Sequence, residues 1–211
     1  MKRFEGKTVL VTGGNRNTGL DIVELFVREG AKVFMCGSSQ SSTLLGAEKL
    51  KERGLEGFTA KSCDISDASQ VEELFNFIEN EAGKLDILVN NAGIIKRIPM
   101  IEMKAEEFRQ VIDVDLNAPF IVSKAVLPSM MKQRSGKIIN ICSMMSEFGR
   151  ETVSAYASAK GGLKMLTRNI ASEYGQYNIQ CNGIGPGYIA TPQTAPLRET
   201  QPDGSKHPFD I

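Results

Sequence analysis

Tyr156 and Lys160 lie four residues apart in the segment SAYASAK, and Ser143 ends an apolar run earlier in the chain. Residues at this spacing share one face of a helix, so a phenol and an ammonium stand side by side. A neighbouring ammonium favours the phenolate, which lets the tyrosine give a proton to a carbonyl oxygen or take one from an alcohol. Ser143 is placed to hydrogen-bond the same oxygen where charge develops. We therefore predict proton transfer at a carbonyl or alcohol, with Ser143, Tyr156 and Lys160 as catalytic residues.

A glycine-rich turn, TGGNRNTG, occupies residues 12–19. Glycines let the backbone approach a pyrophosphate, and the helix that follows directs its positive end toward it. Such a turn alone is often only structural, but here it joins a strand pattern directly to a helix pattern, which favours nucleotide binding. The predicted contacts are Gly13, Asn15, Arg16, Asn17, Thr18 and Gly19.

A second turn, NNAG at 90–93, follows the fourth expected strand. It is either a plain turn or a place where small residues let the adenine ribose lie against the backbone. We interpret Asn91, Ala92 and Gly93 as cofactor contacts, because the two turns and the Ser–Tyr–Lys set together supply the parts needed for hydride transfer to or from a carbonyl.

Short β-branched runs alternate with helical patterns along the whole chain, which is typical of a doubly wound, Rossmann-like α/β sheet. The runs are apolar enough to predict parallel strands buried on both faces. Six strands are expected, at 7–12, 31–36, 57–63, 86–90, 137–142 and 179–184. Helices are expected near 18–29, 43–53, 67–82, 104–133 and 153–174.

Composition predicts one cytoplasmic domain, residues 1–211, with a small-molecule partner. Lys plus Arg and Asp plus Glu number 25 each, which leaves no basic surface for nucleic acid. The N-terminus has no signal-peptide pattern, and no apolar run is long enough to span a membrane. The only histidine, His207, lies in a polar tail. No metal site is predicted, since the cysteines lack ligand spacing and are expected to be reduced and buried: Cys36, Cys63, Cys142 and Cys181.

These motifs, in this order, resemble the short-chain dehydrogenase/reductase family from about Lys7 to the end of the chain. The resemblance implies an NAD(P)-dependent oxidoreductase in which Tyr156 and Lys160 also contact the nicotinamide ribose. It implies that Asp64 contacts the adenine, although an Asp in such a turn is also commonly a helix cap. Its loop over the nicotinamide corresponds to PGYIAT, with contacts at Pro186, Gly187, Ile189 and Thr191.

The end of the second strand decides between NAD and NADP, because an acidic residue there selects NAD. This chain has Gly37, Ser38 and Ser39 at that place, and Arg16 stands where many NADP-using relatives carry a basic residue. The alternative is a solvent-facing arginine beside a plain turn. We expect NADP, with Ser38 among its contacts, and NAD remains open.

Two positions depart from the family's pattern. Asn17 replaces a glycine of the turn, and we expect the turn to survive because asparagine tolerates left-handed backbone angles. Asp115 occupies the position of an asparagine that anchors a water leading to the lysine. The relay is therefore altered or absent: Asp115 either lies near Lys160 through water and stabilises its ammonium, or is a structural residue. Asn117 points elsewhere around the helix and cannot substitute for it.

At the substrate end, residues 94–100, 143–150 and 183–194 resemble gluconate 5-dehydrogenase and its sugar-acid relatives. The expected reaction interconverts a keto and a hydroxy sugar acid, 5-keto-D-gluconate and D-gluconate. Arg97 would bind the substrate carboxylate or is a surface residue, and Arg150 is a second candidate. Together with Arg97, Ser143 and Tyr156 form the predicted substrate site. The alternatives are another sugar or polyol dehydrogenase and a cofactor-binding chain without turnover.

Residues 185–211 are rich in proline, glycine and polar residues, and are either a substrate lid or a frayed tail. The family continues through another helix and a final strand, whereas this chain stops at Ile211. We expect strand 179–184 to be an edge that exposes apolar side chains. A homo-oligomer, a tetramer in the family, is expected if the C-terminus is complete.

Overall fold

A computed structural model describes residues 2–191 and 194 of the chain. Its centre is a six-stranded sheet in the order β3-β2-β1-β4-β5-β6, and every neighbouring pair is parallel. The chain order reverses between β1 and β4, so the predicted doubly wound sheet is confirmed. The strands are β1 Thr8–Thr12, β2 Lys32–Gly37, β3 Phe58–Ser62, β4 Ile87–Asn90, β5 Gly136–Ile141 and β6 Ile179–Ile184.

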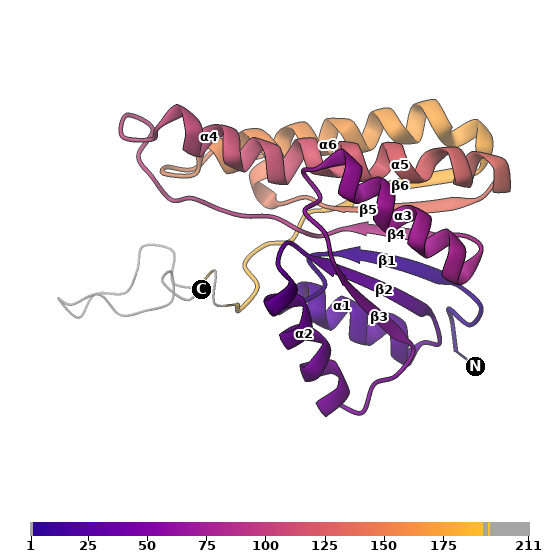
Figure 1. The fold of residues 1–211 in the computed structure, drawn as a ribbon. Coiled ribbons are helices and arrows are strands. Elements are labelled where there is room, and N and C mark those ends of the chain that lie inside the picture. Colours follow the sequence, from indigo (N-terminus) through magenta and orange to yellow (C-terminus); the bar gives the residue numbers. More distant parts are fainter. Residues whose placement is uncertain (1, 192–193, 195–211) are drawn as a thin grey trace.

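Helices cover both faces of this sheet, with α1 and α2 on one side and α3, α5 and α6 on the other (Figure 1). Each face has its own apolar core. Leu20 and Val23 of α1 pack with Val9 on the first face, whereas Leu74 of α3 packs with Leu88 on the second. The helices are α1 Asn17–Arg28, α2 Gln40–Glu52, α3 Ala68–Ala82, α4 Ala105–Ile112, α5 Ala118–Gln133 and α6 Ser154–Tyr174.

The helix expected over 104–133 is divided into three parts. A π-helical turn, η1 Asp113–Asn117, separates α4 from α5. Pro119, two residues after the turn, has no N–H with which to bond the carbonyl of Asp115, so the regular α-helical hydrogen bond is missing at this point. Asp115 is the buried residue of the turn. The π turn therefore places a carboxylate inside the protein, which the periodicity of the sequence did not predict.

Not every strand is buried on both faces. β1 and β4 are fully buried, but β3 is half-buried and the last three residues of β6 are exposed. The difference follows from position, because β3 and β6 are the two edges of the described sheet. Ile184 is 51% exposed, as expected for an apolar residue on an edge strand. All four cysteines are buried and free.

Most of the proposed lid or tail lies outside the described residues. The structure describes 185–191 and Thr194 there, and neither interpretation of 185–211 is tested. Within the described part of the chain, no helix is long and apolar enough to cross a membrane.

Candidate functional site

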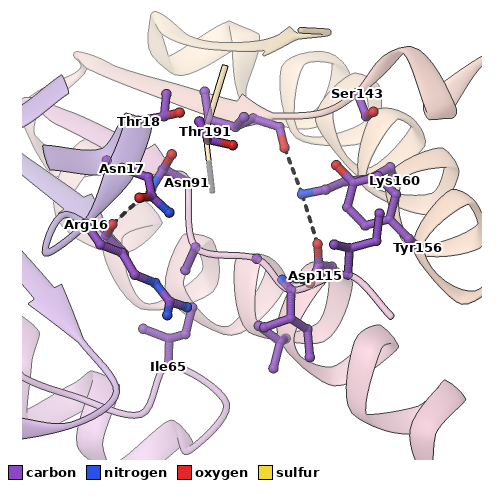
Figure 2. Close-up of a pocket in the computed structure, with 18 of the residues that line it drawn as sticks. Arg16, Asn17, Thr18, Ile65, Asn91, Asp115, Ser143, Tyr156, Lys160 and Thr191 are labelled. Carbon is purple, nitrogen blue, oxygen red and sulfur yellow. Dashed lines mark hydrogen bonds and ion pairs between the residues drawn. The ribbon is translucent and has the colours of Figure 1, made fainter. Parts of the chain in front are cut away.

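One cavity of about 1000 Å³ lies at the carboxyl ends of the strands, where ligands bind in doubly wound sheets. Its lining includes every residue predicted to contact cofactor or substrate. Arg16, Asn17 and Thr18 lie on one side of it, and Ser143, Tyr156 and Lys160 lie on the other (Figure 2). The other predicted residues in the lining are Gly13, Asn15, Gly19, Ser38, Asp64, Asn91, Ala92, Gly93, Arg97, Pro186, Gly187, Ile189 and Thr191.

The glycine-rich turn adopts the backbone that nucleotide binding requires. Gly13 has φ 62° and Asn17 has φ 47°, so asparagine does take up the left-handed conformation in place of the family's glycine. A Cβ at Gly19 would overlap the carbonyl oxygen of Gly13. The turn is thus closed tightly before α1 begins, with the N-terminal end of α1 at the cavity.

Asn15 holds this turn onto the neighbouring helix. It is 7% exposed, and its Nδ2 donates to Ser42 Oγ of α2 at 3.1 Å. A Cβ at Gly37 would lie 2.6 Å from the Asn15 side chain, and one at Gly46 would lie 2.5 Å from its carbonyl oxygen. Asn15 is therefore a packed anchor of the turn, while Arg16 is exposed at the cavity wall. The supporting glycines were not predicted, because they lie far from the turn in sequence.

The NNAG segment is bonded to the same turn. Asn91 Nδ2 donates to the carbonyls of Thr12 at 3.0 Å and Gly13 at 3.2 Å. Thr12 Oγ1 accepts from the backbone N–H groups of Asn91 and Ala92, both at 3.1 Å. The segment is more than a surface turn, since these bonds join the ends of β1 and β4 and leave Ala92 and Gly93 facing the cavity.

Asp64 is not the cap of α3. That cap is Asp67, whose side chain accepts from the N–H groups of Ser69 and Gln70. The Asp64 carboxylate instead accepts from the N–H of Ser66 at 3.0 Å and stays exposed beside the cavity. Ile65, which the sequence analysis did not include, is buried directly beside it and also lines the cavity.

Tyr156 and Lys160 occupy successive turns of α6, with Lys160 Nζ 5.6 Å from the centre of the Tyr156 ring. Ser143 follows β5, and its Oγ accepts from the N–H of Met145 at 3.1 Å. Because that bond uses a lone pair, the hydroxyl proton remains available for a substrate oxygen. Ser146 joins the two segments, since its Oγ accepts from Ser143 N and donates to the carbonyl of Lys160.

Lys160 has a buried partner. It is 4% exposed, and its Nζ donates to the carbonyl of Ile141 at 2.9 Å. Nζ also lies 3.2 Å from Oδ2 of Asp115, so the two groups form a direct ion pair and not the water-mediated approach considered from the sequence. Asn117 points away, as predicted, and its Nδ2 donates to the Asp113 carboxylate at 2.8 Å.

Two arginines face the substrate end of the cavity. Arg97 is half-buried, and its pKa is lowered by burial and by the positive charge of Arg150. Arg150 lies over the ring of Tyr188 with its Cζ 5.7 Å from the ring centre, and it hydrogen-bonds the Tyr188 hydroxyl. Two guanidinium groups that repel each other near Tyr156 create a place for an anion.

The fold and this site define an α/β oxidoreductase of the dinucleotide-binding type. The sequence profile described as short chain dehydrogenase matches residues 7–202. The chain belongs to the short-chain dehydrogenase family, and so is an oxidoreductase that acts on a CH–OH group.

Known relatives extend this similarity. The chain is 47% identical over 207 residues to the 2-dehydro-3-deoxy-D-gluconate 5-dehydrogenase of Formosa agariphila, covering 98% of this chain and 76% of that one. It is 60% identical to the crystal structure of 2-keto-3-deoxy-D-gluconate dehydrogenase from Streptococcus agalactiae, with a TM-score of 0.80 and coverage of 99% and 78%. A gluconate 5-dehydrogenase from Burkholderia cenocepacia, in complex with NADP and tartrate, is 31% identical with a TM-score of 0.86 and coverage of 99% and 86%.

Proposed function

We propose that this protein is an NADP-dependent dehydrogenase that interconverts a hydroxyl and a keto group at C5 of a six-carbon sugar acid. The observation that carries this proposal is the pair of guanidinium groups, Arg97 and Arg150, beside Tyr156 in a single cavity. A carboxylate at one end of the substrate would relieve their repulsion, and its carbon chain would extend toward the Tyr156 hydroxyl.

The cavity fits a nicotinamide dinucleotide. The closed turn at Gly13 and Gly19 and the N-terminal end of α1 would hold the pyrophosphate. Asp64 and Ile65 would bind the adenine, and Lys160 the nicotinamide ribose. When bound, the dinucleotide supplies or accepts the hydride.

The chain's own residues handle the proton. In the reductive direction the Tyr156 hydroxyl gives its proton to the substrate oxygen, to which Ser143 also donates a hydrogen bond. The Lys160 ammonium stabilises the phenolate that remains. In the oxidative direction the phenolate takes the alcohol proton. Ser143 keeps the reacting oxygen in place in both directions, because its backbone is fixed through Ser146 to α6.

NADP is favoured over NAD by charge at the adenosine end. The segment after β2, Ser38 to Thr43, carries no acidic residue, and its hydroxyl groups line the cavity at Ser38, Ser39 and Ser42. Arg16 lies exposed on the adjoining wall. A 2′-phosphate would meet one cation and no carboxylate there. The NADP complex of the Burkholderia cenocepacia relative agrees with this choice.

Among sugar acids, 2-keto-3-deoxy-D-gluconate is the favoured substrate, because the relatives at 47% and 60% identity carry that compound in their names. The sequence-based expectation of 5-keto-D-gluconate and D-gluconate is the second candidate, supported by the gluconate 5-dehydrogenase relative. Both compounds combine a carboxylate with a reacting centre at C5. The substituents at C2 and C3 distinguish them.

A substrate panel tests the proposal. NADP⁺ reduction is followed with 2-keto-3-deoxy-D-gluconate and D-gluconate, and NADPH oxidation with 5-keto-D-gluconate and an uncharged ketose. We expect the highest kcat/KM in the oxidative assays with the 2-keto-3-deoxy acid, and a far lower value for the ketose than for 5-keto-D-gluconate. A ketose that reacts as well as the acid would contradict an anionic substrate. Cofactor binding without any turnover would support a chain that only binds the dinucleotide.

A further inference from the structure

Asp115 is the most completely buried charged side chain beside the reacting groups. It is 0% exposed, and the π turn that carries it directs it toward Lys160 (Figure 2). Oδ1 accepts from the backbone N–H of Ile94 at 2.7 Å, and Oδ2 lies 3.2 Å from Lys160 Nζ. Oδ1 is hydrogen-bonded and Oδ2 lies within ion-pair distance of an ammonium, an arrangement that matches the ionised carboxylate.

The surrounding backbone fixes this carboxylate in place. A Cβ at Gly93 would lie 2.7 Å from Oδ2, so the glycine leaves only enough room for the acid. Burial raises the pKa of Asp115 above its ordinary value, and the Lys160 ammonium and the Ile94 N–H offset only part of that rise. The carboxylate thus joins the loop after β4 to α6, through a neutral backbone N–H on one side and an ammonium on the other.

Several other polar groups surround the same ammonium. Tyr156 lies one turn away on α6, and the thiol of Cys142 approaches from the end of β5, where burial raises its pKa and Lys160 opposes that rise. Lys164 acts on the same thiol more weakly, and Arg97 interacts with Tyr156 from the substrate side. Among these neighbours in the described chain, Asp115 is the one carboxylate in contact with Lys160.

We propose that Asp115 is a positioning residue that partly neutralises Lys160 and thereby sets the pH at which Tyr156 becomes a phenolate. A free ammonium stabilises a nearby phenolate more strongly than one already paired with a carboxylate at 3.2 Å. The ion pair keeps Lys160 oriented between Ile141 and Tyr156 and holds Tyr156 in the protonated form over a wider pH range. The protonated form of Tyr156 is the one that can give a proton to the substrate oxygen when a ketone is reduced.

The test needs no substrate, so its failure is separable from failure of the proposed function. Tyrosinate absorbance is titrated with pH in the parent and in Asp115→Asn. Because the chain has 4 tyrosines, the signal of Tyr156 is isolated by subtracting Tyr156→Phe in each background. We expect the midpoint in Asp115→Asn to be lower by about one pH unit.

Two further variants show that the effect passes through Lys160. Asp113→Asn, in the same π turn but exposed, removes an equal charge and should leave the midpoint unchanged. In a Lys160→Met background, Asp115 has lost its partner and becomes neutral, so Asp115→Asn should no longer change the midpoint.

A midpoint that stays in place or rises in Asp115→Asn overturns the proposal, as does a shift that persists in Lys160→Met. Circular dichroism checks that each variant is folded. If Asp115→Asn does not fold, Asp115→Ala, where water can fill the space, takes its place in the same titration and is judged by the same outcomes.

Discussion

Buried charge has different roles at the two ends of the parallel strands, which we call the carboxyl edge and the amino edge. At the carboxyl edge, Asp115 and Lys160 form a buried ion pair beside Tyr156, and Arg97 and Arg150 both line the cavity. Their arrangement is useful only when a ligand or a reacting oxygen completes it.

At the amino edge, Asp86 precedes β4 and is 9% exposed. Its Oδ2 accepts from the N–H of Thr8 at 2.9 Å, and Oδ1 accepts from Lys84 Nζ at 3.0 Å and lies 3.6 Å from Lys7 Nζ. Its backbone N–H donates to the carbonyl of Thr8, and its carbonyl accepts from the N–H of Lys137. This acid is fully engaged within the protein and joins the starts of β1, β4 and β5.

The contrast shows that a buried charge does not by itself mark function. Asp86 completes its bonds with the first residues of neighbouring strands, so its effect is expected on stability. Asp115 completes its bonds with a lysine that faces the cavity, so its effect is expected on chemistry. Substitutions at the two edges should therefore separate activity from stability.

The largest effect is expected for Tyr156→Phe. Loss of the hydroxyl removes proton transfer, and kcat should fall by about 10²–10⁴-fold. The ring still packs against its neighbours on α6, so the dissociation constant of NADPH and the melting temperature should stay close to those of the parent. Steady-state kinetics, fluorescence titration and thermal unfolding check the three quantities. A kcat within a few-fold of the parent value would mean that Tyr156 does not transfer the proton.

Arg97→Ala comes next. Because Arg97 is half-buried and lies near Arg150, losing its charge-assisted bonds to a carboxylate should raise KM for a sugar acid about tenfold or more. The KM of an uncharged ketose should change much less, and so should the melting temperature. The same assay on both substrates makes the comparison. An equal rise in KM for the acid and the ketose would mean that Arg97 is a surface residue that does not bind the carboxylate.

The fold was predictable from the sequence because strand and helix patterns alternate without interruption. The six strands differ from expectation by only a residue or two at their ends. The π turn at 113–117 was not predicted, since hydrophobic periodicity does not distinguish α from π geometry, although Pro119 in the middle of the expected helix signals an interruption. Burial at the edge strand β3 depends on strand order, which the pattern of single runs does not contain, whereas exposure at β6 was expected from the family resemblance.

The site was predictable where a motif is contiguous, as in 12–19 and 90–93. It was less so where partners meet only in three dimensions. The contacts of Asn15 with Gly37 and Gly46 are of this kind, and so is the buried chain of Asn90, Asn140 and Thr167 at the ends of β4 and β5. Arg150 was a candidate from sequence, but its partner Tyr188 was not, because the two residues lie on separate loops.

Arg16→Ala tests an exposed cation at the carboxyl edge, in contrast to the buried cation Lys160. A solvent-exposed ion pair contributes up to ~1 kcal/mol, which corresponds to about fivefold in affinity. The dissociation constant of NADPH should rise by about that factor, while that of NADH stays unchanged, because only NADPH carries the 2′-phosphate. Fluorescence titration of both cofactors measures this. Equal changes for the two would mean that Arg16 acts on the turn and not on the phosphate.

Asp86→Asn should have the smallest effect of these substitutions. It should lower the stability of the protein and leave its activity unchanged. Burial acts to raise the pKa of Asp86, but the Thr8 N–H and the ammonium groups of Lys84 and Lys7 outweigh it, and the folded-state pKa is lowered. An acid with a lowered folded-state pKa stabilises the protein above its unfolded pKa of about 4, and that contribution is lost as the pH falls through the folded value. Asparagine keeps an acceptor for Thr8 but lacks the charge, so the melting temperature near neutral pH should drop by about 2–4 °C, corresponding to ~1 kcal/mol.

The gap between parent and Asp86→Asn should then close on acidification, because the parent loses its advantage when Asp86 is protonated while the variant has none to lose. Thermal unfolding of both proteins at neutral and acidic pH measures the gap directly, and kcat measured well below the melting temperature should be equal in the two. A gap that is constant with pH would mean that packing, and not charge, explains the loss. A fall in kcat would mean that the amino edge of the sheet contributes to the chemistry at the carboxyl edge, and the division between the two edges would fail.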